Sequence, residues 1–387
     1  MTTIDLVYFD AGGGHRAAAT ALRDMASAQR RPWTVRMVHL MQVLDPTDAF
    51  RRVCGMAPED FYNRRLASGW TIGLASELRA LQTMIRIAHP SLVRRLSAHW
   101  TRTRPDLVVS LVPNFNRALC DALAQACPGA PFVTVMTDLA DHPPAFWIEP
   151  DLAQHIVCGS RRAVEQAVQA GCAPARIHAV GGMILRRDFH QPAPVPGPEA
   201  LAELGLDPSR PTAVVMFGGQ GSARMLKVAA ALKDVQLLLL CGHNETLLRS
   251  LRGMRRPAPH AAIGFTTRVP HYMRLGDVFV GKPGPGALSE ALHCGLPVVT
   301  FRNAWTLPQE RYNTHWVEAL GVGRVVPSMR GLPGAVNEVL AHSGAMRQRV
   351  RSLENRAVFE VLDLLDRLLA RTPARPGTSV DPEGLAA

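Results

Sequence analysis

The stretch Gly281-Lys-Pro-Gly-Pro-Gly-Ala-Leu-Ser-Glu290 decides the fold of this chain. The apolar run Val278–Val280 directly before it is typical of a buried strand, and the residues from Ala287 onward favour a helix. A glycine-rich turn between a strand and a helix presents unpaired backbone N–H groups and the positive end of the helix dipole. This junction therefore predicts a binding site for a diphosphate.

Polar side chains around the turn are predicted to complete a site for a nucleotide-sugar. Glu290 lies one turn into the helix, where it can accept hydrogen bonds from two ribose hydroxyls; alternatively, it only favours the helix dipole. Gln309 and Glu310 follow the next predicted strand, Pro297–Phe301, and are placed to bind a sugar. Alternatively, they are only polar residues of a loop. Lys282 adds positive charge there or points to solvent. The residues assigned to the diphosphate are Gly284, Gly286, Ala287 and Leu288, with a second turn at Gly218, Gly219 and Gly221 as support.

A second strand–turn–helix unit stands near the start of the chain. Ile4–Phe9 is an apolar run, Asp10-Ala-Gly-Gly-Gly-His15 is a turn, and Arg16–Ala28 has a helical pattern. Two such units predict an α/β chain with two doubly wound domains facing each other across a cleft, because ligands bind at the carboxyl ends of parallel strands. The turn would hold His15 at the mouth of this cleft, with Gly13 and Gly14 allowing a bulky molecule to approach.

Strand-like and helix-like segments alternate along the rest of the chain, as expected for parallel α/β domains. We expect a first domain at 1–188, a stiff proline-rich linker at 189–200 and a second domain at 201–346. A long helix at 347–370 is expected to return to the first domain, and the tail at 371–387 to be disordered. The further strands are predicted at Thr34–His39, Leu107–Leu111, Phe132–Met136, His155–Cys158, Thr212–Phe217, Gln236–Cys241 and Ala261–Gly264.

The composition narrows the class of protein. The seven cysteines are odd in number and scattered, which favours free thiols in a reducing cytosol over a disulfide or zinc framework. The chain enters a strand almost at once, so no secretory signal is expected. The net charge of +11 calls for an anionic partner. Nucleic acid is not favoured, since the sequence contains no helix-turn-helix, zinc-finger or RNA-binding signature.

The segment 61–104 concentrates the positive charge. It contains eight arginines and one acid, Glu77, together with Trp70 and Trp100 and apolar residues at helical spacing. A basic amphipathic helix with flanking tryptophans is typical of docking onto anionic lipid. Alternatively, the helix is an ordinary one whose apolar face joins the core and whose arginines are solvated.

Several motifs together resemble the GT-B glycosyltransferases, in particular the monogalactosyldiacylglycerol synthase and processive diacylglycerol glucosyltransferase group, which is related to the MurG-type transferases. The resemblance covers most of the chain. It departs from the family at Gly182-Met183, where Gly-Pro or Pro-Val is common, and at Gln220, which interrupts a glycine run. The matching motifs are Gly12-Gly-Gly-His15, Val135-Met-Thr-Asp138-Leu-Ala-Asp-His142 with Trp147, Gly181-Gly-Met-Ile-Leu-Arg186, Phe217-Gly-Gly-Gln-Gly221, Gly284-Pro-Gly286 with Glu290, Pro308-Gln-Glu310 with Asn313, and Asn355-Arg-Ala-Val-Phe-Glu360.

This resemblance implies a GT-B fold of two Rossmann-like domains and an inverting transfer of galactose or glucose from a UDP-sugar to diacylglycerol. The UDP-sugar would be a substrate, with no cofactor and no metal required. His15 would be the catalytic base, with Asp138 as its assistant or its rival. Phe265 and Thr266 would edge the uracil, and His142 and Trp147 would belong to an acceptor loop.

The expected location is peripheral, on the cytoplasmic face of an anionic membrane, without nucleic acid. Other readings of the same residues stay open at this point. They are a transferase for a soluble or polyprenyl-linked acceptor, a UDP-sugar epimerase, and a non-catalytic binding protein on a transferase scaffold.

Overall fold

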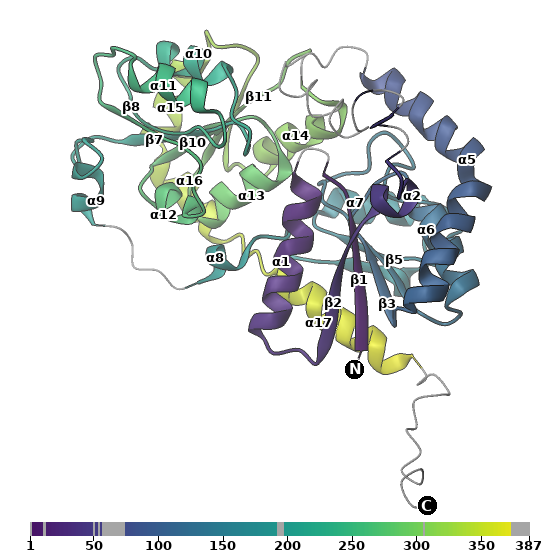
Figure 1. Ribbon diagram of the computed structural model, residues 1–387. Coiled ribbons are helices and arrows are strands. Elements are labelled where there is room, and N and C mark those ends of the chain that lie inside the picture. Colours follow the sequence, from purple (N-terminus) through teal and green to yellow (C-terminus); the bar gives the residue numbers. More distant parts are fainter. Residues whose placement is uncertain are drawn as a thin grey trace, which may run out of the picture.

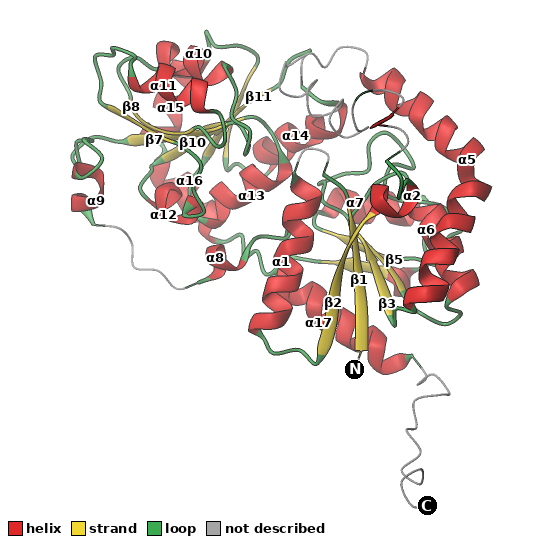
Figure 2. Cartoon of the chain, in the orientation of Figure 1, coloured by secondary structure: helices red, strands yellow, loops and turns green. Residues whose placement is uncertain are grey.

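The computed structural model describes residues 2–10, 13–48, 51–52, 55, 74–191, 197–304 and 306–372, with only the backbone of residues 74–76. Gly12, the part of the basic segment before Leu74, residues 192–196 of the predicted linker and the tail from residue 373 lie outside this description. The described residues form two parallel six-stranded sheets, each with helices on both faces (Figures 1 and 2). The predicted α/β class is thereby confirmed.

The first sheet has the strand order β2-β1-β3-β4-β5-β6, and all neighbouring strands are parallel. Its inner strands β3 and β4 are short apolar runs that are fully buried, the usual pattern of a parallel sheet covered on both faces. The strands are β1 (Thr2–Tyr8), β2 (Trp33–His39), β3 (Leu107–Ser110), β4 (Phe132–Val135), β5 (His155–Cys158) and β6 (Ile177–Ala179).

Two groups of helices cover the faces of this sheet. Successive strand residues point to opposite faces, so Val109 packs with α1 and α17 whereas Val108 packs with α5 and α6. Figure 1 shows α1 on one side of the sheet and α5 and α6 on the other. In α17, Val358, Val361, Leu365 and Leu368 repeat at helical spacing and form its buried stripe. The helices of this domain are α1 (Gly14–Ala28), α2 (Leu40–Leu44), α5 (Leu74–Thr103), α6 (Asn116–Ala126), α7 (Arg161–Gln169), the short 3-10 turn η1 (Pro174–Arg176) and α17 (Ala357–Arg371).

The second sheet has the order β12-β11-β10-β7-β8-β9 and is also parallel throughout. Helices α10, α11 and α15 cover one face, and α8, α12, α13 and α16 contribute to the core of the other. The strands are β7 (Thr212–Met216), β8 (Gln236–Leu240), β9 (His260–Ile263), β10 (Val278–Gly281), β11 (Val298–Phe301) and β12 (Gly323–Val326). The helices are α8 (Arg187–His190), α9 (Pro198–Ala202), α10 (Arg224–Ala231), α11 (Glu245–Arg252), α12 (Val269–Arg274), α13 (Pro285–His293), η2 (Pro308–Glu310), α14 (Arg311–Ala319), α15 (Leu332–Ala341) and α16 (Ser343–Arg351).

The long helix predicted at 347–370 is wrong, because the chain forms α16 and α17 with a break between them. Asn355 holds the break, since its side-chain oxygen accepts a hydrogen bond from the Ala357 amide and its amide donates to the Met183 carbonyl. Helix α16 contributes Val350 to the core of the second domain, whereas α17 packs on α1 of the first. The chain therefore crosses between the domains at this break.

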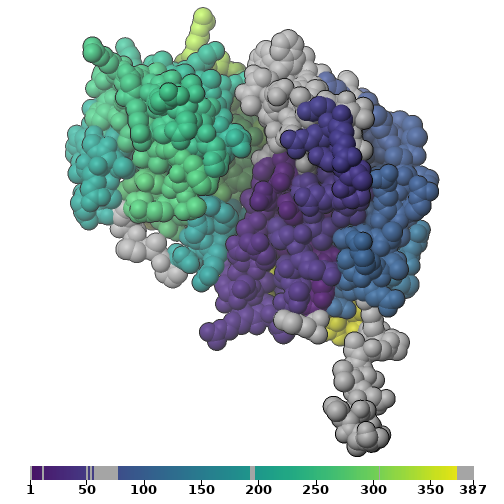
Figure 3. Space-filling view, in the orientation of Figure 1, coloured from purple at the N-terminus to yellow at the C-terminus, as the bar shows by residue number. Residues whose placement is uncertain are grey.

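The other crossing lies earlier than the boundary predicted at 188. Val180 and Ile184 pack against the core of the first domain, but Leu185 and Phe189 are buried in the core of the second. Of the linker predicted at 189–200, Phe189 is buried in the core of the second domain and Pro198 begins α9, whereas residues 192–196 lie outside the described residues. Figure 3 shows the two domains as lobes lying side by side, one teal to green and one purple to blue.

Candidate active site

Both sheets have a point where the strand order reverses, and the two predicted glycine turns lie at these points. In the first sheet the reversal lies between β1 and β3, and in the second between β7 and β10. Ligands of doubly wound sheets bind at such switch points, outside the carboxyl ends of the strands. The turn with His15 follows β1, whereas the turns at Gly218 and Gly284 follow β7 and β10.

His15 is the second residue of α1 and is held by the loops after β3 and β4. Its Nδ1 lies 2.8 Å from the Leu111 carbonyl oxygen and 3.1 Å from the Thr137 hydroxyl. A carbonyl oxygen can only accept, so Nδ1 carries the proton and Nε2, on the other edge of the ring, keeps its lone pair. The imidazole is thus oriented as a proton acceptor. Gly13 caps the helix at φ 77°, a left-handed conformation that suits glycine.

Burial sets the protonation state of His15. Desolvation lowers its pKa to about 4, although the hydrogen bond to Leu111 acts in the opposite direction. The ring lies between Phe9, whose ring centroid is 4.7 Å away, and Trp147, at 5.9 Å. The imidazole is therefore neutral at pH 7, the form that a general base requires.

Asp138 lies on the loop after β4, next to the residue that contacts His15. Its carboxylate accepts a hydrogen bond of 2.9 Å from Trp147 Nε1. Burial raises the pKa of Asp138 to about 7, and the bond from Trp147 only partly offsets this effect. Trp147, predicted as part of an acceptor loop, is fully buried. It instead positions Asp138 and packs beside His15.

The start of α13 offers the backbone amides of Gly286 and Ala287 to a ligand, but not that of Leu288. The Leu288 amide already donates to the Gly284 carbonyl at 3.1 Å, so the assignment of Leu288 is wrong. Pro285 has no N–H, and the amides of Gly286 and Ala287 are the first-turn donors that an α-helix leaves without internal partners. A side chain at Gly286 would meet no atom within 4 Å, so this turn faces open space.

The turn after β7 lies beside the turn after β10. A Cβ placed on Gly218 would lie 3.7 Å from Lys282 Cε, and the Lys282 ammonium lies 2.9 Å from Glu310 Oε1. Gly221 is required by packing, since a Cβ there would come within 2.3 Å of the Cys241 carbonyl oxygen. Gly219 accepts a hydrogen bond from the His243 amide, which fixes the turn to the loop after β8.

Glu290 is half-buried on the second turn of α13. Burial raises its pKa to about 7, with the positive charge of Arg186 acting against this and the negative charge of Asp188 adding to it. Its neighbours therefore come from the segment that enters the second domain. A carboxyl group with a raised pKa beside the predicted diphosphate site suits a hydrogen-bonding role toward ribose hydroxyls, which stays a prediction.

The residues predicted to contact the sugar are buried together. Gln309 and Glu310 form η2 at the end of the loop after β11, and each is less than a tenth exposed. Asn313, one turn later, donates a hydrogen bond of 2.7 Å to the Pro283 carbonyl. This bond connects the sugar-side helix to the loop at the start of α13, so the two parts of the predicted site are held in one arrangement.

The predicted uracil edge is an exposed aromatic surface. Phe265 is 59% exposed and stacks on His243, with ring centroids 3.9 Å apart and planes inclined by 19°. The Thr266 hydroxyl accepts a hydrogen bond from the Arg268 amide and so shapes the loop. Met273, on α12 after this loop, is fully buried in the core of the second domain.

The two switch points face each other. The charges of Glu310 and Lys282, both in the second domain, influence the pKa of Asp138 in the first. Desolvation lowers the pKa of His142 in the first domain, and the positive charge of Arg311 in the second domain lowers it further. The predicted acceptor side and donor side therefore lie across one interdomain site.

Solved structures with the same architecture identify the fold. The glycotransferase of kitacinnamycin superposes with a TM-score of 0.60 at 17% identity over 95% of this chain and 99% of that one. MurG of Acinetobacter baumannii gives 0.59 at 12% identity, covering 95% and 100%. Anabaena HepE in complex with UDP gives 0.53 at 15% identity, covering 96% and 100%.

The sequence relatives are synthases of one lipid. A probable chloroplastic monogalactosyldiacylglycerol synthase of Nicotiana tabacum is 27% identical over 345 residues, which span 84% of this chain and 62% of that protein. Monogalactosyldiacylglycerol synthase 1 of Arabidopsis thaliana is 26% identical over 398 residues, or 96% and 72%. The chain has the GT-B fold of glycosyltransferases. No protein-family model matches it.

Sequence reasoning missed one positioning residue of this candidate site, Asp141. Its two carboxylate oxygens accept hydrogen bonds from the Trp147 amide at 2.6 Å and the Ala145 amide at 3.1 Å. The Gln166 side chain fixes the backbone of Asp141, because it accepts a hydrogen bond from the Asp141 amide and donates one to the Asp141 carbonyl. Asp141 therefore shapes the loop that carries His142 and positions Trp147. Its place within the Asp138–His142 motif was the available signal.

We expect Asp141→Asn to destabilise the loop, because an amide NH₂ would face one of the two backbone amides. Leaving one buried donor unpaired costs about 1–3 kcal/mol, so thermal unfolding should begin several degrees lower. Turnover should fall about tenfold if Trp147 no longer holds Asp138. Asp234→Asn, at an exposed position just before β8, is the matched control and should change neither quantity. Unchanged unfolding and turnover in Asp141→Asn would contradict the assigned role.

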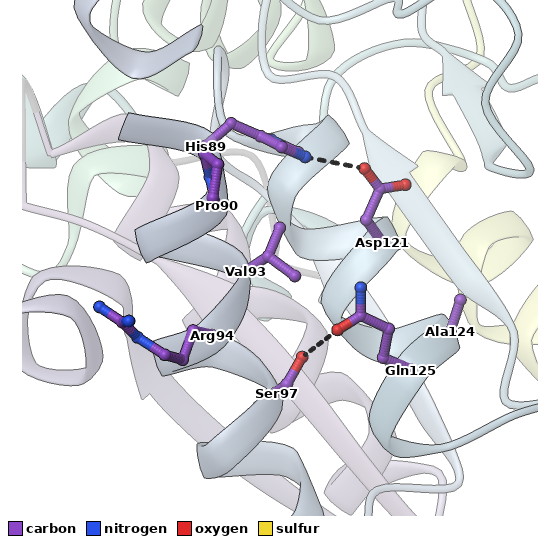
Figure 4. A pocket seen from close by; sticks show the side chains of 8 residues that line it. All are labelled: His89, Pro90, Val93, Arg94, Ser97, Asp121, Ala124 and Gln125. Atoms are coloured by element: carbon purple, nitrogen blue, oxygen red, sulfur yellow. Dashed lines mark hydrogen bonds and ion pairs between the residues drawn. The ribbon is translucent and has the colours of Figure 1, made fainter. Parts of the chain in front are cut away.

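A separate groove on the first domain lies outside this site. It runs between α5 and α6, has a volume of about 710 Å³ and includes the ion pair of His89 with Asp121 at 3.1 Å (Figure 4). No residue predicted for catalysis or donor binding lines it.

Among the described helices, none is both long and apolar enough to cross a bilayer.

Proposed function

We propose that the protein transfers a hexose, galactose or glucose, from a UDP-sugar to diacylglycerol, with inversion at the anomeric carbon. One observation carries the proposal. Asp138 of the first domain lies close enough to Lys282 and Glu310 of the second for their charges to act on it. A proton acceptor and an anion site therefore share one interdomain site, as direct glycosyl transfer requires.

The proposed step is a single displacement. The acceptor hydroxyl oxygen forms a bond to the anomeric carbon while the bond from that carbon to the β-phosphate oxygen breaks, and UDP leaves with the electron pair. His15 Nε2 takes the hydroxyl proton, and a nearby anionic diphosphate favours the imidazolium form that results. The amides of Gly286 and Ala287 stabilise the charge on the departing diphosphate. No metal or cofactor takes part in this scheme.

Two comparisons support the choice of donor and acceptor. The Anabaena protein with the same fold was solved with UDP, and the plant relatives are named for a galactolipid. The exposed Phe265 surface suits the flat face of a base, and Glu290 suits the ribose. The choice between galactose and glucose depends on side-chain positions within about an ångström around Gln309 and Glu310.

Helix α5 supports a membrane-bound acceptor. Leu81, Met84 and Ile87 are exposed on it by 37%, 59% and 77%. Gln82, on the same part of the helix, donates hydrogen bonds to the Pro144 and Ala145 carbonyls of the loop after His142. The exposed apolar residues, with arginines at 79 and 86 nearby, therefore adjoin the predicted acceptor loop, where insertion into the cytoplasmic face of an anionic membrane would deliver diacylglycerol.

Replacing Leu81, Met84 and Ile87 together by serine should weaken vesicle binding. Each exposed side chain would contribute about 1 kcal/mol or more on insertion, so sedimentation with vesicles containing phosphatidylglycerol should fall at least tenfold. UDP affinity should not change, because these residues lie outside the donor site. Val168→Ser, which removes a comparably exposed side chain from α7, is the control. Equal sedimentation of the triple variant and the wild type would contradict membrane docking through α5.

Product analysis by mass spectrometry tests the function itself. The protein is incubated with anionic vesicles containing diacylglycerol and, separately, UDP-galactose, UDP-glucose and UDP-N-acetylglucosamine. A hexosyl-diacylglycerol formed from one of the first two donors is the expected result. UDP binding without any glycolipid product would overturn the acceptor, and soluble or polyprenyl-linked acceptors would then be tested. Release of an epimerised UDP-sugar would indicate an epimerase instead.

A further inference from the structure

A lysine side chain bridges the two glycine turns of the second domain. Lys282 follows β10, and its Cε would lie 3.7 Å from a Cβ on Gly218 and 3.4 Å from a Cβ on Gly284. It therefore runs across the switch point of the second sheet, between the turn after β7 and the start of α13. This is where the proposed diphosphate meets the free amides of Gly286 and Ala287.

The same lysine holds a buried carboxylate. Its ammonium lies 2.9 Å from Glu310 Oε1, and the Lys282 side chain is 38% exposed whereas that of Glu310 is only 9% exposed. An ammonium has three donors, and Glu310 takes one of them. The ammonium is thus fixed from the protein side while part of its surface stays open.

An arriving diphosphate would compete with Glu310 for this ammonium. The diphosphate of a UDP-sugar carries two negative charges, and a third develops as UDP departs. An ammonium prefers the more highly charged partner, and charge-assisted hydrogen bonds are strong in a partly dehydrated site. When Lys282 turns toward the phosphate oxygens, its hydrogen bond to Glu310 is lost. The Glu310 carboxylate can then accept a hydrogen bond from a sugar hydroxyl instead.

We propose that Lys282 is a catalytic residue that binds the diphosphate, and that Glu310 exchanges Lys282 for a sugar hydroxyl when the donor binds. This inference rests on the proposed use of a UDP-sugar, not on the identity of the acceptor. It makes diphosphate binding and sugar recognition depend on each other, because one ion pair must open for both. UDP without its sugar would open the pair and leave the carboxylate without a new partner.

Isothermal titration calorimetry tests the exchange without any acceptor. It measures the affinities of the protein for UMP, for UDP and for the UDP-hexose identified as donor. In Lys282→Met, UDP affinity should fall about 10- to 100-fold, the value of one charge-assisted hydrogen bond, whereas UMP affinity should change little. Lys282→Arg retains the charge and should restore much of the preference for UDP. In Glu310→Gln, UDP should bind as well as or better than in the wild type, and the UDP-hexose should lose its advantage over UDP.

Two outcomes would overturn the inference. One is an equal loss of UMP and UDP affinity in Lys282→Met, which would indicate a damaged nucleotide site. The other is a loss of UDP affinity in Glu310→Gln, which would mean that Glu310 only holds the lysine in place. Thermal unfolding of the double variant Lys282→Met/Glu310→Gln checks folding, since this variant leaves no buried carboxylate unpaired. These binding measurements can support the exchange at Lys282 and Glu310 even when no glycolipid is formed. Failure of the exchange and failure of the proposed acceptor are therefore distinguishable.

Discussion

Replacing His15 by alanine is expected to lower kcat by about 10²- to 10⁴-fold, the usual contribution of a general base. The structure places the proton of the neutral ring on Nδ1, where the Leu111 carbonyl accepts it. Nε2 is then the only ring atom able to accept the acceptor's proton. Alanine removes this atom. Among the described residues, no other side chain forms hydrogen bonds to both the Leu111 carbonyl and the Thr137 hydroxyl.

Binding and folding separate this effect from a structural one. His15 belongs to the first domain, so His15→Ala should keep its affinity for UDP and its unfolding temperature close to the wild type. His89→Ala, in the groove between α5 and α6, is a matched control that should retain full turnover. A His15→Ala variant with more than a tenth of the wild-type kcat would remove His15 from the proposed mechanism and leave Asp138 as the base.

The glycine turns made the fold predictable from the sequence. Each stands between a buried apolar run and a helical pattern, and the structure places each at a strand-order reversal. The missed strands β6 and β12 are only three and four residues long, and their neighbours across the sheet supply most of what stabilises them. Their sequences, Ile-His-Ala and Gly-Arg-Val-Val, contain too few consecutive apolar residues to be predicted singly.

The contacts that position the site could not be predicted in this way. His15 is oriented by Leu111 and Thr137, which lie 96 and 122 residues away in sequence. Trp147 looked like an acceptor-loop residue, yet its indole N–H turns inward to a buried carboxylate. Such pairings depend on how loops from different strands meet, and nothing local in the sequence encodes them.

Helix α5 shows the limit of periodicity more clearly. The sequence suggests one apolar face with Leu78, Leu81 and Ile85, but the structure buries Leu78, half-buries Ile85 and exposes Leu81. Apolar residues at 84 and 87 extend a second, exposed face. Since both faces repeat at helical spacing, only the position of the neighbouring elements determines which one packs.

Asp138→Asn is expected to abolish most of the turnover and to stabilise the protein. The Asn side-chain oxygen can still accept the hydrogen bond from Trp147, so the loop geometry should persist. The buried negative charge is lost, however, and with it the assistance to His15, which should lower kcat at least about 100-fold. In the wild type, kcat/KM should rise as pH passes through about 7, where Asp138 becomes charged. In the variant this rise should flatten.

The stability change has a defined sign. The pKa of Asp138 is about 7 in the folded protein and near its usual value of 3.8 in the unfolded chain. Between these values the folded state binds more protons, so stability falls as pH rises, by about 1.4 kcal/mol per pH unit for a fully separated pair of pKa values. The asparagine variant escapes this loss. Its unfolding temperature should exceed that of the wild type by several degrees at pH 8, and by less at pH 5.

Glu290, whose pKa is also raised to about 7, separates the two effects. Glu290→Gln should remove a similar burden on stability, but should raise KM for the UDP-sugar because the ribose loses its carboxylate partner. If Asp138→Asn raised KM instead of lowering kcat, Asp138 would belong to substrate binding. An asparagine variant that is less stable than the wild type at pH 8 would mean that the charged carboxylate stabilises the loop. The raised pKa of Asp138 would then have another origin than uncompensated burial.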